Sequence, residues 1–306
     1  MKRDFLRYLS RLRPDSYLRS QRNRHLFGMT SRQEQDWLRT YAAKTYRGLG
    51  ALVDLGCFLG ATTISLAEGL TLNSKAGQNR IHAYDLFTWS KDFELWAQGR
   101  EVEGDFTIDE SFLPEFLKRT ENWRDYIVVH EEDLAHAQWH GGAIEFLLVD
   151  AMKSPEIASA ILRGFFPHLL PERSYVMQQD FAHCDTPWIH LLAFRLRNYF
   201  SVAADVPKSA TTVFRCEREL LRADLEMDLS LRSCSVAEIE AAFDYTLYLV
   251  ADDKKANVIA AKAMAYRERG DSARARDIIT QAEYGSESLG DEFERVRNLL
   301  FAETFT

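Results

Sequence analysis

The chain of 306 residues lacks the features that mark several classes of protein. It has only four cysteines and no C-x-x-C pair, which disfavours a disulfide framework or a zinc-finger site and suits reduced thiols in a cytoplasmic protein. No apolar run reaches the length of a membrane span, and no apolar signal-peptide core follows the basic start. The net charge of −8 argues against a general nucleic-acid binder.

Positive charge is scarce overall but concentrated at the start of the chain. Residues 1–27 hold eight Lys and Arg against two Asp, a net charge of about +6 that leaves about −14 on the rest. Phe5, Leu9 and Leu12 share one helical face of this segment. Such a helix could contact a membrane surface, an anionic ligand or a partner. Packing on the acidic body of the protein or on a sister subunit is the favoured alternative.

The stretch Leu52–Thr63 reads LVDLGCFLGATT: an apolar run with one acid, two glycines four residues apart, and small hydroxylated residues that open a helix. We expect a strand that carries Asp54 near its end and turns at Gly56. Gly60 then allows the backbone to approach a ligand where a Cβ would collide. Free N–H groups at the start of the following helix would line a ligand site of the nucleotide type.

Strand and helix patterns alternate from Leu52 to about Cys216, which predicts an α/β fold with a parallel sheet. The five expected parallel strands are Ala51–Leu55, Arg80–Asp85, Tyr126–His130, Ile144–Asp150 and Tyr175–Gln179. The expected helices between and after them are Ala61–Leu70, Pro114–Asn122, Pro155–Phe165 and Pro187–Phe200. Ser201–Val206 and Thr211–Cys216 flank a turn and predict a final antiparallel hairpin.

The pattern D-x-G-x-x-x-G, with Phe58 between its glycines, resembles motif I of class I S-adenosylmethionine (SAM) dependent methyltransferases. It is most similar in style to the macrocin-type sugar O-methyltransferases. Five parallel strands followed by an antiparallel pair also resemble the seven-stranded, Rossmann-like sheet of that superfamily. The resemblance covers about 170 residues and implies a SAM-binding methyltransferase domain over residues 41–216.

Residues 1–40 are expected to form a basic helical segment, and residues 217–306 an all-α C-terminal region. Within this region, one helix pair has the spacing of a tetratricopeptide repeat. Its pattern residues are Ala263, Tyr266, Gly270, Ala275, Ile279 and Ala282. A single repeat does not make a solenoid, so a helical hairpin docked on the catalytic domain or across a dimer is favoured over a peptide-binding array.

The resemblance implies a set of cofactor-binding residues. The acid Asp54 would lie near the methionine amino group of SAM, and the turn from Gly56 through Phe58 to Gly60 near its carboxylate and ribose. Asp85 matches the acid that accepts both ribose hydroxyls. Leu86 and Phe87 follow it, and Phe87 stacks on adenine or belongs to the core.

Two further positions of the cofactor site carry alternatives. Thr62 and Thr63 cap the following helix, which is the commoner role, or hydrogen-bond the carboxylate of the ligand. Asp133 would accept from the adenine amino group and is chosen over its acidic neighbours because Leu134 follows it. These assignments depend on the resemblance.

Asp150 and Asp180 end the fourth and fifth expected strands. Two such carboxylates can hold a divalent cation or act as base and orienting group, with Asp150 opposite the transferred methyl group. Metal-dependent relatives carry paired acids at both places, and here each pair has lost one, so Mg²⁺ is the minority expectation. Lys153 matches a lysine of caffeoyl-CoA-type O-methyltransferases and is either an active-site group or a solvated loop residue.

His183 lies three residues after Asp180 and is the candidate base of a metal-free mechanism, with Asp180 or Asp150 to orient it. A histidine that is merely hydrogen-bonded in its loop is nearly as plausible. The aromatic-rich segment Thr88–Thr120 is expected to form a lid over the acceptor or to pack against itself.

Together these patterns predict a cytoplasmic SAM-dependent methyltransferase of biosynthesis that O-methylates a hydroxylated small molecule such as a glycoside or natural-product intermediate. No nucleic-acid partner is expected, and terminal helices could join subunits into a homodimer. The alternative is a methyltransferase-like scaffold that has lost catalysis and assembles a biosynthetic complex. A less favoured possibility keeps the SAM site but transfers another group.

Overall fold

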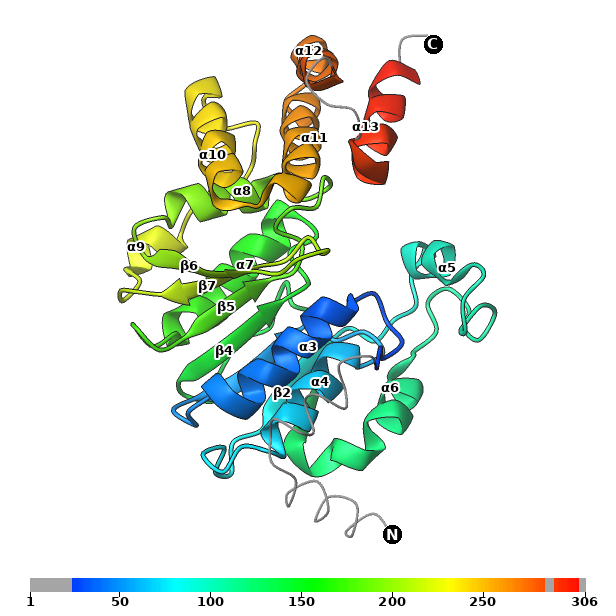
Figure 1. Ribbon diagram of the computed structural model, residues 1–306, viewed down its shortest axis with the longest axis vertical. Helices are drawn as coiled ribbons and strands as arrows, with labels where there is room; N and C mark the ends of the chain where they lie inside the picture. Colours follow the sequence, from blue (N-terminus) through cyan, green and yellow to red (C-terminus); the bar gives the residue numbers. More distant parts are fainter. Residues whose placement is uncertain (1–23, 284–288, 303–306) are drawn as a thin grey trace. The chain divides into compact units, whose positions relative to one another are not determined.

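The computed structural model describes residues 24–283 and 289–302 (Figure 1). The basic helix expected within residues 1–27 therefore lies outside the described residues, except for its last four. The chain forms two compact units. Unit 1 comprises the described part of Met1–His136 together with Ile144–Phe146, and unit 2 comprises Ala137–Ala143 together with the described part of Leu147–Thr306. The expected domain boundaries after residues 40 and 216 stay a prediction.

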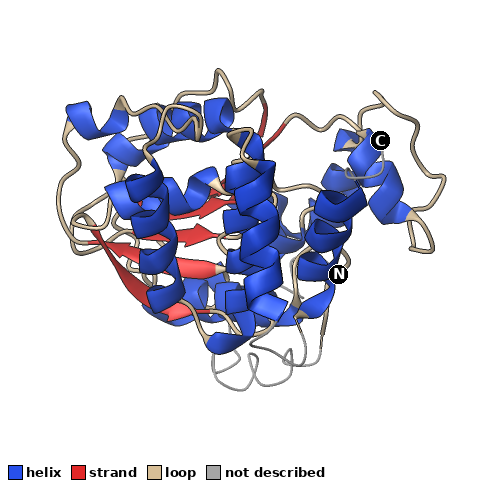
Figure 2. Cartoon of the chain, turned by 90° about the horizontal axis from the view of Figure 1, so that it is seen from above, coloured by secondary structure: helices blue, strands red, loops and turns tan. Residues whose placement is uncertain are grey.

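Seven strands form a mixed sheet with the order β3-β2-β1-β4-β5-β7-β6, and helices flank the strands (Figure 2). They are β1 (Ala51–Leu55), β2 (Ile81–Asp85), β3 (Ile127–Glu131), β4 (Ile144–Val149), β5 (Tyr175–Gln178), β6 (Phe200–Asp205) and β7 (Thr212–Cys216). The strands β1, β2 and β3 pair in parallel, while β7 is antiparallel to β5 and β6. The expected seven-stranded α/β fold is confirmed, and each expected strand boundary lies within one residue of the observed one.

The helix α3 (Arg32–Thr40) precedes the sheet, and α9 (Arg222–Leu225) follows it. The helices between the strands are α4 (Ala61–Leu70), α5 (Lys91–Ala97), α6 (Leu113–Thr120), α7 (Pro155–Phe165) and α8 (Trp188–Arg195). The bounds of α4 and α7 are those expected. The prediction that α8 extends to Phe200 is wrong, because a turn at Leu196–Tyr199 ends the helix and Phe200 pairs with Cys216 in the sheet.

In unit 1, α4 is a buried helix that packs against α3 and β2. All five residues of β1 and all ten of α4 are buried, so this helix is covered on every side. A buried ion pair joins Arg39 of α3 to Glu68 of α4 at 2.6 Å, and Arg24 contacts the same carboxylate at 2.5 Å. Arg24, at the end of the basic segment, thus pairs with an acid of the protein's own body.

Unit 2 ends in four helices: α10 (Val236–Leu249), α11 (Asp252–Glu268), α12 (Ser272–Glu283) and α13 (Gly290–Ala302). The helices α11 and α12 pack together through buried Ala263, Tyr266, Ala275 and Ile279, with Gly270 in the left-handed turn between them. This is the expected helical hairpin. Within unit 2 it is docked through Lys254 of α11, whose ammonium contacts Asp205 at the end of β6. Of the described helices, none has the length and apolar character needed to cross a membrane.

Candidate functional site

In unit 1, the turn between β1 and α4 contains three residues with left-handed backbone conformations. The φ angles are 84° at Gly56, 46° at Phe58 and 89° at Gly60. The amides of Gly56 and Cys57 both donate to the carbonyl of Tyr84 at the end of β2, at 2.9 and 3.2 Å. The turn is thus fixed against the neighbouring strand, and the expected sharp bend at Gly56 is present.

The structure gives Gly60 a role in packing that the sequence does not predict. A Cβ at this position would lie 2.9 Å from Cγ2 of Thr120 and 3.2 Å from the ring of Phe116. The missing side chain therefore admits the packing of the protein's own α6, in addition to the positive φ angle that glycine adopts freely. Close approach of a ligand is not needed to explain this glycine.

Asp54 is the central residue of the turn. Its side chain is fully buried, and its Oδ2 accepts hydrogen bonds from the hydroxyls of Thr62 at 2.8 Å and Thr63 at 2.6 Å. Its Oδ1 is buried and has no partner among the described residues. Burial raises the pKa of Asp54 to about 6, although the two threonine hydrogen bonds oppose this rise.

This arrangement corrects the prediction for the two threonines. The N-cap of α4 is Gly60, which supplies no side chain, so neither Thr62 nor Thr63 caps the helix. Both hold one oxygen of Asp54 and leave the other unpaired. An unpaired buried carboxylate oxygen is costly, which makes Oδ1 a ready acceptor for a donor that the chain itself does not provide.

Asp85 ends β2 close to the same turn. Its Oδ2 accepts from the backbone N–H of Phe58 at 2.8 Å and its Oδ1 from that of Phe87 at 2.9 Å. Burial raises its pKa, while the backbone amides of Phe87, Phe58 and Leu86 oppose the rise. Each oxygen retains a second lone pair, so the carboxylate can still accept from two hydroxyls. The side chain of Leu86 is 56% exposed and presents an apolar surface beside this acid.

Phe87 belongs to the core and does not stack on adenine. It is fully buried, and its ring packs against Phe112 and Phe116. Phe58 is also buried, and it packs against Trp89, Phe93, Trp96 and Phe112. Much of the aromatic content of the segment Thr88–Thr120 therefore packs against itself and against the glycine turn.

Asp133 and Leu134 follow β3 in unit 1. Asp133 is exposed, and its Oδ1 accepts from the backbone N–H of Ala135 at 2.9 Å, while Leu134 is buried. The assignment of Asp133 to the adenine amino group stays a prediction.

In unit 2, a lysine joins the two acids that were expected at the strand ends. The Nζ of Lys153 lies 2.8 Å from Oδ1 of Asp150 and 2.5 Å from Oδ2 of Asp180. Desolvation lowers the pKa of Lys153, but the two carboxylates outweigh it and raise the pKa above its usual range. Lys153 is therefore a protonated cation at neutral pH and does not serve as a base.

The same contacts bear on the expected Mg²⁺. The ammonium of Lys153 lies between the two carboxylates, at the position that a shared divalent cation would need. One positive charge already pairs with both acids, so the arrangement gives no support to a metal bound by Asp150 and Asp180.

His183 faces other acids than those expected. Its Nδ1 lies 3.9 Å from the carboxylate of Asp185, and its Nε2 lies 3.9 Å from that of Glu292. Its backbone N–H donates to the carbonyl of Asp180 at 3.1 Å, but among the described residues its imidazole pairs with neither the Asp180 nor the Asp150 carboxylate. Glu292 comes from α13, more than one hundred residues further along the sequence. The expected orientation of His183 by Asp180 or Asp150 is therefore wrong.

The sequence does not predict a role for Gln179 of unit 2. Gln179 lies between β5 and Asp180, and its side-chain Oε1 is buried without a partner among the described residues. Its backbone N–H donates to the carbonyl of Val149 at 3.0 Å. The only signal in the sequence is its place at a strand end, which does not distinguish it from Gln178.

Comparison with known proteins gives matches to solved structures alone. No family model and no curated protein matches the chain. One similar structure is the O-methyltransferase NovP, at 12% identity over 71% of this chain and 100% of that chain, with a TM-score of 0.49. Another is a putative rRNA methylase from Clostridium thermocellum, at 15% identity over 64% of this chain and 100% of that chain, with a TM-score of 0.42. A third is phosphoethanolamine N-methyltransferase 1 of Haemonchus contortus, solved with phosphoethanolamine and S-adenosylhomocysteine. It is 14% identical over 73% of this chain and 53% of that chain, with a TM-score of 0.43.

The names of these three structures are those of an O-methyltransferase, a putative rRNA methylase and an N-methyltransferase. Identities and TM-scores this low leave activity and substrate open, so a function has to be argued from the residues of the chain.

Proposed function

We propose that this protein is a SAM-dependent methyltransferase that transfers a methyl group to a hydroxyl of a small molecule. The observation that carries the proposal is the divided environment of Asp54. One oxygen is held by two threonines, and the other is buried and unpaired beneath a glycine turn at the end of β1. A cationic N–H donor such as the α-ammonium of SAM would satisfy that oxygen.

Three further residues of unit 1 would hold the rest of the cofactor. Asp85 would accept from the ribose hydroxyls with the lone pairs that its two backbone hydrogen bonds leave free. The exposed side chain of Leu86 would cover one face of the adenine ring. Asp133 would accept from the adenine amino group.

When bound, SAM supplies a methyl group activated by a positively charged sulfur. The protein's part is to align the acceptor hydroxyl and remove its proton. We assign this work to Asp150, Lys153 and Asp180 of unit 2. Asp150 takes the hydroxyl proton, and the ammonium of Lys153 stabilises the negative charge that develops on the acceptor oxygen. The Lys153 side chain is 55% exposed, so an acceptor can reach it.

Calorimetric titration with SAM and S-adenosylhomocysteine tests the cofactor site. Replacing Asp54 by Asn removes a charged hydrogen-bond acceptor, so affinity should fall by roughly 10- to 100-fold. The matched control is Asp125→Asn, because Asp125 is an exposed acid of the same unit whose side chain is 82% exposed. Unchanged affinity in both Asp54→Asn and Asp85→Ala would refute the proposed SAM site.

The methyl-transfer step needs its own test. Labelled SAM would be incubated with the full chain and a panel of hydroxylated glycosides and phenols, and label in the acceptor would be measured in a single turnover. Transfer that depends on Asp150 supports the proposal. Tight SAM binding with no transfer to any acceptor would instead favour the scaffold alternative.

A further inference from the structure

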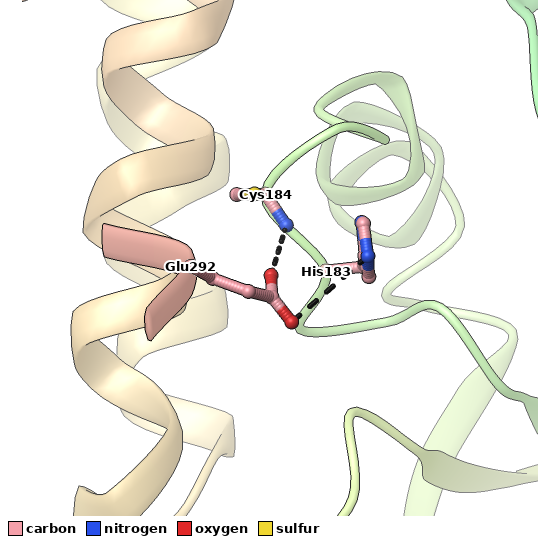
Figure 3. A group of neighbouring side chains, drawn as sticks. All are labelled: His183, Cys184 and Glu292. Carbon is pink, nitrogen blue, oxygen red and sulfur yellow. Dashed lines mark hydrogen bonds and ion pairs between the residues drawn. The ribbon is translucent and has the colours of Figure 1, made fainter. Parts of the chain in front are cut away.

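A mixed group of metal-ligand side chains lies in unit 2, apart from Asp150, Lys153 and Asp180. It comprises His183 and Cys184, from the loop after β5, and Glu292, from the first turn of α13 (Figure 3). Each offers one donor atom, and these atoms lie within 4.8 Å of one another. The three residues therefore bring an imidazole, a thiol and a carboxylate to one place.

Glu292 connects the two segments directly. Its Oε2 accepts from the backbone N–H of Cys184 at 2.9 Å, and its Oε1 points to Nε2 of His183 at 3.9 Å (Figure 3). Asp185 lies 3.9 Å from Nδ1 of the same imidazole. A histidine that binds a metal through Nε2 carries its proton on Nδ1, and a carboxylate on that side fixes the ring. In the structure the backbone N–H of Asp185 donates to Nδ1 at 3.2 Å. To bind a metal through Nε2, His183 would exchange this hydrogen bond for one that its Nδ1–H donates to the nearby Asp185 carboxylate.

A cation of the protein's own already lies against this cluster. The guanidinium of Arg295 is 2.8 Å from Sγ of Cys184 and 2.6 Å from Oδ2 of Asp185. Arg295 belongs to α13, one turn after Glu292. Positive charge is thus favoured beside these donors, and a metal ion would have to displace the guanidinium from the sulfur.

We propose that His183, Cys184 and Glu292 bind a zinc-type divalent metal ion that fastens α13 to the loop after β5. Thiolate and imidazole together select Zn²⁺ over Mg²⁺ or Ca²⁺, and a carboxylate completes a ligand set that zinc accepts. The residues Phe293, Val296 and Leu300 of α13 are buried, and α13 packs against α11 and α12 within unit 2. The metal would fix the end of the loop that begins at Asp180, independently of the proposed methyl transfer.

Metal binding has a cost at the thiol. Zinc binds the thiolate form of cysteine, so the metal must displace the proton of the Cys184 thiol. Binding should therefore release protons and become tighter as pH rises.

The test is a titration of the chelator-treated full chain with Co²⁺, followed by competition with Zn²⁺. A thiolate bound to Co²⁺ produces a charge-transfer absorption band in the near ultraviolet. We expect this band to saturate at one equivalent of Co²⁺ per chain and to disappear when Zn²⁺ is added. Cys184→Ala should lose the band, while Cys234→Ala, which removes a buried thiol outside the cluster, should retain it. A band that persists in Cys184→Ala, or no band in the wild type, would overturn the site.

Two other variants separate ligand loss from misfolding. Glu292→Gln removes a direct ligand, so Zn²⁺ affinity should fall by at least the roughly 10- to 100-fold that is typical when a residue supporting a ligand is lost. Arg295→Gln should strengthen it, because the competing cation is removed. Zn²⁺ should raise the melting temperature of the wild type and of Arg295→Gln. Weaker binding in Arg295→Gln would contradict the proposed competition.

Discussion

At the scale of single residues, Asp54 shows how burial converts a common side chain into a specific acceptor. A fully buried carboxylate needs hydrogen-bond donors on both oxygens, and the described chain supplies two hydroxyls to one oxygen and none to the other. The unpaired oxygen and the raised pKa of Asp54 have the same cause. The buried carboxylate receives too few hydrogen bonds to stabilise its negative charge.

The pH dependence of cofactor binding follows from this pKa. In the free protein Asp54 titrates at about 6, and a ligand ammonium binds only the carboxylate form. Binding must release a proton below that pH, so affinity for S-adenosylhomocysteine should fall by about tenfold per pH unit below 6 and be level above it. Calorimetric titration with S-adenosylhomocysteine at pH values on both sides of 6 would measure this change in affinity. Asp54→Asn should flatten the profile, and an unchanged profile in that variant would assign the titration to another group.

Lys153 is the second residue whose role follows from its contacts. Replacing it by Met removes the charge between Asp150 and Asp180 and the donor proposed for the acceptor oxygen. The rate of methyl transfer should fall by roughly 100- to 1000-fold, the usual cost of losing such a donor.

The same variant distinguishes catalysis from cofactor binding. Affinity for SAM, measured by titration, should be unchanged in Lys153→Met, because the proposed cofactor residues lie in unit 1. Lys153→Arg keeps the charge and should retain part of the rate. A rate in Lys153→Met equal to that of the wild type would show that Lys153 is a structural ion-pair residue.

At the scale of elements, local patterns were sufficient for most of the sheet and its helices. The helix α7 begins where Ser154 caps it and Pro155 follows, and the strand β1 is an apolar run with Asp54 as its one polar residue. The helix α8 is the exception. Its pattern continues beyond Arg195, but pairing of Phe200 with Cys216 ends the helix early, and a propensity cannot anticipate a long-range pairing.

The candidate site divides in the same way. Positions at strand ends could be predicted, since carboxylates after apolar runs mark them: Asp54, Asp85, Asp150 and Asp180 all lie where expected. The partners of these groups could not. The contact of His183 with Glu292 joins residues far apart in sequence, and no local signal distinguishes the Phe87 of the core from one that faces a ligand.

At the scale of the whole molecule, the C-terminal helices are part of unit 2 rather than an attached tail. One buried charge fastens them. Lys254 of α11 is 3% exposed, contacts Asp205 and donates to the carbonyl of Thr211 at 2.7 Å. Asp205 also accepts from the backbone N–H of Ala251 at 2.8 Å, directly before α11. The end of β6 and the start of α11 thus meet at one ion pair.

Breaking this pair should destabilise unit 2. Lys254→Met leaves the carboxylate of Asp205 without its cation, and removing one partner of a buried ion pair costs about 3–5 kcal/mol. The adjacent Lys255 supplies a matched control, because it pairs with an Asp252 that is 95% exposed. Lys255→Met should cost less than about 1 kcal/mol. Chemical denaturation of both variants measures the difference, and equal losses would mean that the contact of Lys254 with Asp205 does not hold α11 to the sheet.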